Sequence, residues 1–239
     1  METTRTLPDQ FEPSPARAFG VLLWTLLPSI TMWIGLYELN SATWAFALYH
    51  FVYLVPAIII GRTLWRKSLV RPTVKGMLVM SVVAVLYSLV AILGFEIMST
   101  LFLSHKDVVA LLNRVGWSHN SFWMLSIYAV IVNPFLEELF WRGVVLNELD
   151  RWKLPFKHFG IMWSSFTYAL FHYLIFKLVL FPFYAEIGIA MLAIYGAILA
   201  VVYRKTGSII TTAFAHGLLA DTAAVSLMIN LARHYPNTF

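Results

Sequence analysis

Long apolar runs alternate with short polar connections along the chain, and this pattern predicts an all-α polytopic membrane protein with about seven transmembrane helices. Each run holds about 20 residues, enough for one helix to cross the hydrocarbon core of a bilayer. A transmembrane β-barrel would instead show alternating segments of about ten residues. The predicted spans are 17–39, 42–61, 76–103, 122–147, 159–176, 178–203 and 209–232.

Two prolines and one polar connection modify this pattern. Pro134 lies inside the fourth run and predicts a kink, since proline cannot donate the helical hydrogen bond. Pro182 lies inside the sixth run, which could therefore be two shorter helices. The connection after the third run could hold a short interfacial helix from Val108 to Val115.

Polarity divides the chain into four segments, none of them long and polar enough to form a separate soluble domain. Residues 1–16 form a polar, loose N-terminal tail, and residues 17–121 hold helices 1–3 with their connecting loop. Residues 122–232 hold helices 4–7, which carry the candidate chemistry. Residues 233–239 form a C-terminal tail.

The distribution of basic residues predicts the orientation of the protein. Two lysines or arginines near the N-terminus, five in 62–75, three in 148–158 and two in 204–207 would share one side, twelve in all. Four lie on the opposite side. Because cytoplasmic loops carry an excess of Lys and Arg, we expect a cytoplasmic N-terminus. The compact size and the lack of a targeting segment favour the plasma membrane of a prokaryote.

Composition excludes several other classes of protein. The chain is 60% hydrophobic and 12% charged, about half the charged fraction of a soluble domain. It has no cysteine, so disulfides, thiolate metal sites and cysteine nucleophiles are excluded. The net charge of +5 fits basic loops at an anionic membrane face. No aromatic-interleaved basic patch indicates nucleic-acid binding.

Five ionisable residues in the later runs indicate a functional site. Glu137, Glu138 and Arg142 lie within six residues of the fourth run, although one charge near the bilayer centre costs at least about 2.5–3.5 kcal/mol. At about 1.5 Å per residue, Glu137 lies roughly 15 Å from the cytoplasmic end of its span. His172 lies roughly 20 Å and His216 roughly 10 Å from the same side. We therefore expect one shared polar site.

The residue types in this site suit hydrolysis. No Gly-x-Ser-x-Gly or His-Glu-x-x-His pattern occurs, which argues against a serine hydrolase and a zincin. A glutamate in an apolar surrounding is a competent general base for water. Two histidines can orient that water, ligate a metal or donate to an oxyanion. A divalent metal such as zinc is therefore an option, and Glu137, His172 and His216 would hold it.

Helical spacing separates the roles of the two glutamates. Glu138 and Arg142 are four residues apart, on one helix face, and predict a structural ion pair. Glu137 lies about 100° away from Glu138, so we expect its carboxylate to face a cavity. Gly143 would allow another helix to approach closely beside the pair.

The motifs of residues 122–225 resemble those of the CPBP family, the CAAX prenyl protease and bacteriocin-processing (Abi) group of intramembrane proteases. They are Glu137-Glu138-x-x-x-Arg142-Gly143, then Tyr168-x-x-x-His172, then His216 in a late span. The resemblance implies that Glu137 activates the attacking water, while His172 and His216 position it or stabilise the oxyanion. Glu138, Arg142 and Tyr168 would support them.

Two positions differ from the family pattern. Tyr168 stands where phenylalanine is usual, which we expect to be a mild change. The residue four positions after the last histidine is often asparagine or aspartate, and here it is Ala220. Asp221, the next residue, lies about 140° from His216 around an α-helix. Asp221 could support the site only if the helix is distorted.

The resemblance implies an intramembrane endopeptidase whose partners are the lipid bilayer and a membrane-embedded or membrane-associated peptide or protein substrate. One alternative is a non-proteolytic member of the family that acts as a membrane scaffold or self-immunity protein, which the alanine at position 220 favours. Another is a transporter or proton relay, against which no inverted repeat is visible. The buried charges could also form a purely structural ion network.

Overall fold

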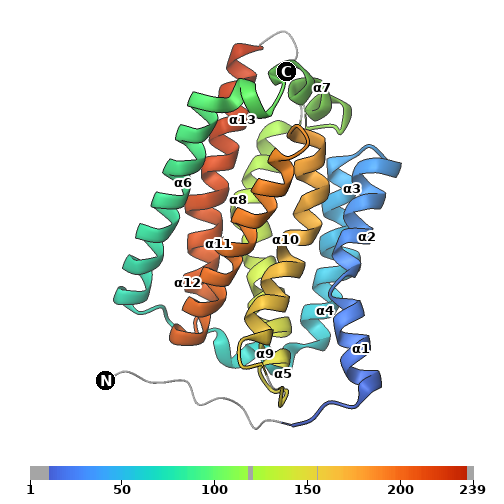
Figure 1. Cartoon of the computed structure of the whole chain (residues 1–239), viewed down its shortest axis with the longest axis vertical. Coiled ribbons are helices and arrows are strands. Elements are labelled where there is room, and N and C mark those ends of the chain that lie inside the picture. The colour runs from blue at the N-terminus through green and yellow to red at the C-terminus, as the bar shows by residue number, and fades with distance from the viewer. Residues whose placement is uncertain (1–10, 118–120, 155, 236–239) are drawn as a thin grey trace.

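The computed structural model describes residues 11–117, 121–154 and 156–235 as a bundle of helices (Figure 1). Within these residues, seven helical segments are long and apolar enough to span a membrane, which confirms the predicted fold class. The spans are Pro15–Glu38, Ala42–Ile60, Val74–Phe95, Phe122–Leu149, Phe159–Val179, Tyr184–Thr206 and Ile209–His234.

Several spans consist of more than one helical element, and short helices connect them. The first three spans and their connections hold α1 (Pro15–Trp24), α2 (Leu27–Trp33), η1 (Ile34–Glu38), α3 (Ala42–Ala47), η2 (Leu48–Leu54), α4 (Val55–Ile60), α5 (Arg62–Trp65), η3 (Arg66–Ser68), α6 (Val74–Phe102) and α7 (His105–Arg114). The last four hold α8 (Phe122–Glu138), η4 (Leu139–Leu146), α9 (Asn147–Leu149), α10 (Phe159–Val179), α11 (Tyr184–Thr206), α12 (Ile209–Phe214), η5 (Ala215–Asp221) and α13 (Thr222–His234).

The connection between the fifth and sixth spans corrects the predicted boundary there. The fifth span continues to Val179, and the sixth begins only at Tyr184. Pro182 therefore lies between two helices and does not break one. Phe183, with φ of 74°, turns the chain immediately before α11. The short helix predicted from Val108 to Val115 is present as α7 (His105–Arg114), which begins three residues earlier, after its N-cap Ser104.

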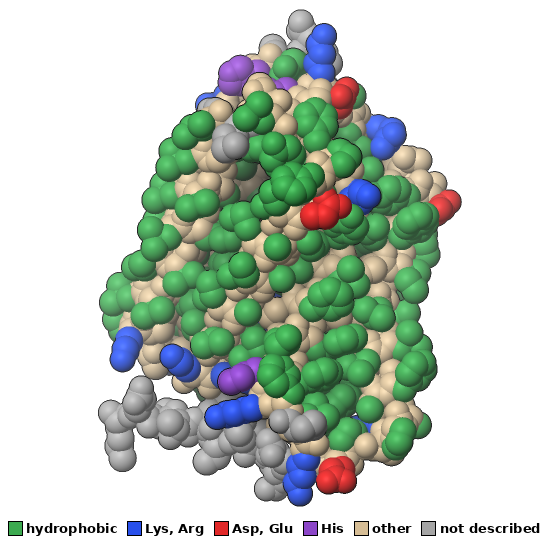
Figure 2. Space-filling model, viewed as in Figure 1, with side chains coloured by type: hydrophobic (Ala, Val, Ile, Leu, Met, Phe, Trp, Pro, Cys, Tyr) green, Lys and Arg blue, Asp and Glu red, His purple; other side chains and the backbone are tan. Residues whose placement is uncertain are grey.

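The outer surface of the bundle is apolar as well as its interior, as expected for helices that lie in a membrane. Hydrophobic side chains cover the flank of the molecule in Figure 2, and most of the charged ones in this view lie towards its two ends. The interior is rich in aromatic residues. Tyr49, Trp141, Tyr168 and Tyr195 are each at most 1% exposed.

The loops that carry most of the basic residues lie together at one end of the bundle, the lower end in Figure 1. The N-terminal tail was predicted to be loose, but its described residues, from Phe11 onward, are bound to the protein at this end. Phe11 exchanges backbone hydrogen bonds with Arg151 and Lys153, both 2.8 Å. Arg17, near the start of α1, forms an ion pair of 2.7 Å with Glu148. The assignment of this end to the cytoplasm stays a prediction from charge.

Four of the spans contain a π-helical stretch, in which hydrogen bonds close over five residues. These are η1, η2, η4 and η5. The segment η4 follows directly after Glu138, and η5 contains His216. Single-turn π-bulges occur frequently at functional sites. Two of these four π-helical stretches, η4 and η5, therefore lie at candidate site residues.

Candidate active site

The ion pair at the centre of the site joins two residues of the fourth span. The Arg142 guanidinium lies 2.9 Å from the Glu138 carboxylate, as the i, i+4 spacing predicts. Its Nη2 also donates to the Gly196 carbonyl oxygen at 3.1 Å. The guanidinium carbon lies 4.8 Å from the centroid of the Tyr168 ring. Arg142 thereby connects the fourth span to α10 and α11 within the core.

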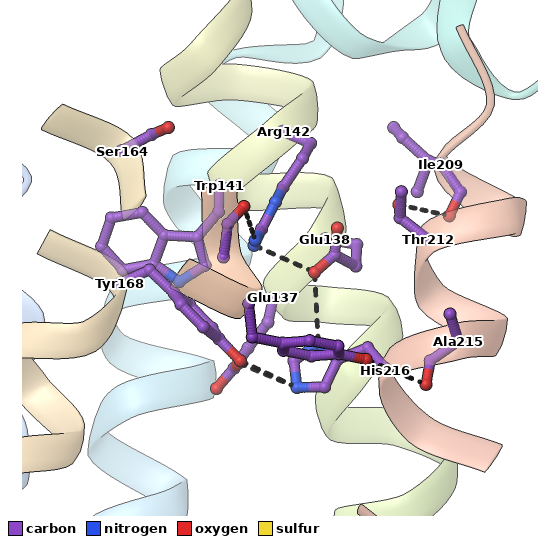
Figure 3. Close-up of polar contacts among 12 residues, drawn as sticks. Glu137, Glu138, Trp141, Arg142, Ser164, Tyr168, Ile209, Thr212, Ala215 and His216 are labelled. Carbon is purple, nitrogen blue, oxygen red and sulfur yellow. Dashed lines mark hydrogen bonds and ion pairs between the residues drawn. The ribbon is translucent and has the colours of Figure 1, made fainter. Parts of the chain in front are cut away.

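His216 brings the seventh span into this cluster (Figure 3). Its Nδ1 lies 3.1 Å from Glu138 Oε1. Because a carboxylate accepts hydrogen bonds, Nδ1–H is the donor in this contact. Its Nε2 lies 3.1 Å from the Tyr168 hydroxyl and 3.7 Å from Glu137 Oε2. One imidazole therefore contacts both glutamates and the tyrosine.

Glu137 is enclosed by neighbouring side chains and does not face a cavity. It is 1% exposed. The Tyr49 hydroxyl, from the second span, lies against its carboxylate. The Oε2 atom has no hydrogen-bond partner among the described residues. The expected open cavity is thus absent around Glu137 in this arrangement of the described residues, but one acceptor oxygen remains open to a further hydrogen bond.

The π-helical segment η5 moves Asp221 into the site. In an α-helix Asp221 would point about 140° away from His216. In a π-helix, residues five apart lie one above the other, because the hydrogen bonds close over five residues. Asp221 Oδ1 accordingly lies 3.6 Å from His216 Nε2. The helix distortion that the sequence required for this contact is present.

Hydroxyl groups from three elements stabilise the carbonyl groups of this segment. Tyr195 of α11 donates to the Ala215 oxygen at 3.2 Å, and Ser88 of α6 donates to the Leu219 oxygen at 3.1 Å. Thr222 donates to the Gly217 oxygen at 3.2 Å. A carbonyl oxygen has two lone pairs, so it can accept such a bond beside a backbone one. The Gly217 and Leu219 oxygens, for example, also accept from the Thr222 backbone N–H. These bonds hold η5 in its π-helical register.

A proline and a glycine allow the fourth and seventh spans to approach closely. Pro134 has no N–H, so it frees the carbonyl of Val130 one turn earlier. Gly217, next to His216, packs against that carbonyl, and a Cβ atom at Gly217 would lie 2.3 Å from the Val130 oxygen. A real Cβ atom cannot be accommodated at this distance. The contact sets the approach of His216 to Glu137.

His172 lies at the edge of the site. Its Nδ1 is 2.9 Å from the Tyr168 carbonyl oxygen, to which it donates. Its ring packs against Phe171 and Tyr168, with centroids 4.0 and 4.9 Å apart. Within the described part of the chain, no hydrogen bond or ion pair joins His172 to Glu137. Because a carbonyl only accepts, the neutral ring presents its Nε2 lone pair to the surroundings.

The predicted metal ligands do not gather into a metal site. No group of three or more His, Asp or Glu side chains in the described residues has an arrangement that could hold a metal ion. Glu137, His172 and His216 are therefore a poor fit to zinc in this arrangement.

Sequence reasoning missed two polar residues beside the site. Asn133, in the fourth span, accepts a hydrogen bond of 2.9 Å from His50 Nε2. His50 comes from the second span and is fully buried. The only signal was that both are polar residues inside apolar runs. The Tyr168 hydroxyl, which the phenylalanine usual in the family lacks, also contacts His216 directly.

Comparison with known proteins finds one family model that matches the C-terminal helices. Residues 119–220 match the model of the family described as type II CAAX prenyl endopeptidase Rce1-like. The resemblance indicated by the motifs is thereby confirmed for this segment, and it supports a CAAX-protease-like intramembrane endopeptidase in general. The match ends at Ala220, one residue before Asp221. No curated protein and no solved structure matches the chain.

Proposed function

We propose that this protein hydrolyses a peptide bond within or beside the bilayer, with Glu137 as the general base for the attacking water. The observation that carries the proposal is the position of Glu137 Oε2, which has no hydrogen-bond partner among the described residues and lies 3.7 Å from His216 Nε2. A water molecule can hydrogen-bond to both atoms at once. Transfer of its proton to the carboxylate would generate the nucleophile.

The remaining residues divide into water-directing and supporting groups. His216 would orient the water or stabilise the oxyanion, while Glu138 fixes the imidazole through Nδ1. His172 would assist from the edge of the site through Nε2. Arg142 holds Glu138 in place, and Tyr168 contacts His216. The contact between Asp221 and His216 weakens the case for an inactive scaffold protein, because a carboxylate reaches the histidine despite alanine at position 220.

The substrate class follows from the family name and the surroundings of the site. We infer a prenylated C-terminal peptide, because the matched family is described as a CAAX prenyl endopeptidase. A lipid-facing groove of about 470 Å³ lies between α8 and the seventh span. It is lined entirely by apolar side chains, including Leu136 beside Glu137. Since Glu137 and His216 are at most 3% exposed, helices must part before a substrate reaches them.

Peptide cleavage by the purified protein in liposomes tests this proposal. The substrates are matched fluorogenic peptides with and without a farnesyl group on a C-terminal Cys-aliphatic-aliphatic-Xaa sequence. We expect Glu137→Gln to lower the rate at least about 100-fold, the usual contribution of a general base. Glu148→Gln, at the lower end of the same span, is the matched control and should cleave normally.

Equal cleavage by wild type and Glu137→Gln would overturn the assignment of the base. Equal rates on the two peptides would remove the prenyl group from the substrate class. The same assay with a chelator tests whether a metal ion takes part, because loss of activity would show that the protein requires one.

A further inference from the structure

The environment of Asp221 contains a polar chain that crosses three spans. His50 Nε2 of the second span donates to Asn133 Oδ1 of the fourth span at 2.9 Å. The Asn133 side chain also lies beside the carboxylate of Asp221 in the seventh span. Asp221 Oδ1 in turn lies 3.6 Å from His216 Nε2. The chain therefore runs from a buried histidine to the candidate site.

The chemistry of an amide fits this arrangement. A primary amide has one accepting oxygen and a donating NH₂ group. With Oδ1 accepting from His50, the Nδ2 group is left as a donor for the neighbouring Asp221 carboxylate. A polar side chain in a membrane span is expensive unless such partners are available. Asn133 also lies one turn before Glu137, on the same face of α8.

We propose that Asn133 is a positioning residue of the active site, which fixes Asp221, and through it His216, by bridging the Asp221 carboxylate to the buried His50. This inference rests on the proposed peptidase function. Asp221 comes from a π-helical segment and has an Oδ2 atom without a partner in the described residues. Without the amide its carboxylate is free to turn away from His216. His50 in turn keeps the amide from rotating.

A double-mutant cycle in the cleavage assay tests the proposal. Asn133→Leu, which preserves size but removes both polar groups, should lower kcat about tenfold, as expected for loss of a hydrogen-bonded positioning group. KM should change less than about threefold, because no contact with substrate is removed. In an Asp221→Asn background, Asn133→Leu should have almost no further effect, because coupled residues are non-additive.

Two further variants separate positioning from packing. His50→Phe keeps a ring between Phe46 and Tyr128 but removes the donor, and it should lower kcat in the same way, by a smaller factor. Tyr128→Phe is the matched control. The Tyr128 ring contacts His50 at a centroid distance of 5.3 Å, but its hydroxyl has no hydrogen-bond partner among the described residues. This variant should cleave like wild type.

The outcomes distinguish this proposal from the proposed function. If Glu137→Gln is inactive but Asn133→Leu retains wild-type kcat, the positioning role is overturned and the peptidase stands. An equal loss from Asn133→Leu in the wild-type protein and in the Asp221→Asn variant also overturns it, since Asn133 would then act independently. If Glu137→Gln cleaves normally, both proposals fail. The same double-mutant cycle can be measured without substrate by thermal unfolding. Strictly additive losses of Tm for Asn133→Leu and Asp221→Asn would show that the two residues are not coupled and would overturn the proposal.

Discussion

The buried ion pair between Glu138 and Arg142 gives the sharpest prediction about stability. Arg142→Met keeps much of the volume of the side chain but removes its charge. Arg142 is 1% exposed and Glu138 is fully buried, so the carboxylate would lose its cationic partner within the core. Removal of one partner from a buried ion pair destabilises a protein by about 3–5 kcal/mol.

The corresponding change in melting temperature can be estimated. For chains of 150–250 residues, 1 kcal/mol shifts Tm by about 2–4 °C, so Arg142→Met should lower Tm by about 6–20 °C. The assay is thermal unfolding in detergent, followed by tryptophan fluorescence. Arg17→Met is the control, since Arg17 forms an ion pair with Glu148 but its side chain is 49% exposed. Because Arg17 is largely exposed and Glu148 keeps Arg151 as a second cationic partner, the loss should be at most about 1 kcal/mol, which corresponds to less than about 4 °C.

A second substitution identifies the cause of the loss. If the cost of Arg142→Met comes from a buried carboxylate that keeps only His216 as a partner, adding Glu138→Gln should recover part of it, because the neutral amide leaves no buried charge. A double variant less stable than Arg142→Met alone would refute this reasoning. The loss would then arise from the broken contacts of Arg142 with Gly196 and Tyr168.

Two further predictions concern helix approach and His216. Gly217→Ala should disrupt the close contact with the Val130 carbonyl and abolish cleavage with a marked loss of Tm, whereas Gly94→Ala, where a Cβ meets nothing within 4 Å, should leave both unchanged. Tyr168→Phe should lower kcat up to about tenfold with KM unchanged, because it removes one hydrogen bond to His216. Wild-type kcat in this variant would show that the hydroxyl is dispensable.

Hydrophobic pattern alone predicted the seven spans because the bilayer imposes strict rules. Every backbone polar group in lipid needs an internal partner, so long apolar runs must be helices. The ion pair of Glu138 with Arg142 could be predicted equally well, since it depends only on local spacing. The end of the fifth span could not be predicted, because the turn at Phe183 depends on a backbone conformation that apolar residues do not signal.

The position of Asp221 could not be predicted from local sequence. Its distance from His216 depends on whether the seventh span is α-helical or π-helical at that point. In this segment the carbonyl groups also accept hydrogen bonds from hydroxyl groups on other elements, such as Ser88 and Tyr195, which the local sequence does not indicate. From the sequence one can conclude only that Asp221 needs a distorted helix to reach His216. Whether the helix is distorted depends on contacts with other helices of the bundle.

The second and third spans therefore take part in the site, although the family match begins only at residue 119. Ser88 of the third span holds a carbonyl of η5, and His50 of the second span holds Asn133. Tyr49, also from the second span, lies against Glu137. Each contact fixes a residue or segment that chemistry at Glu137 would need. The geometry of the site is thus a property of the whole bundle and not only of the four helices that carry the motifs.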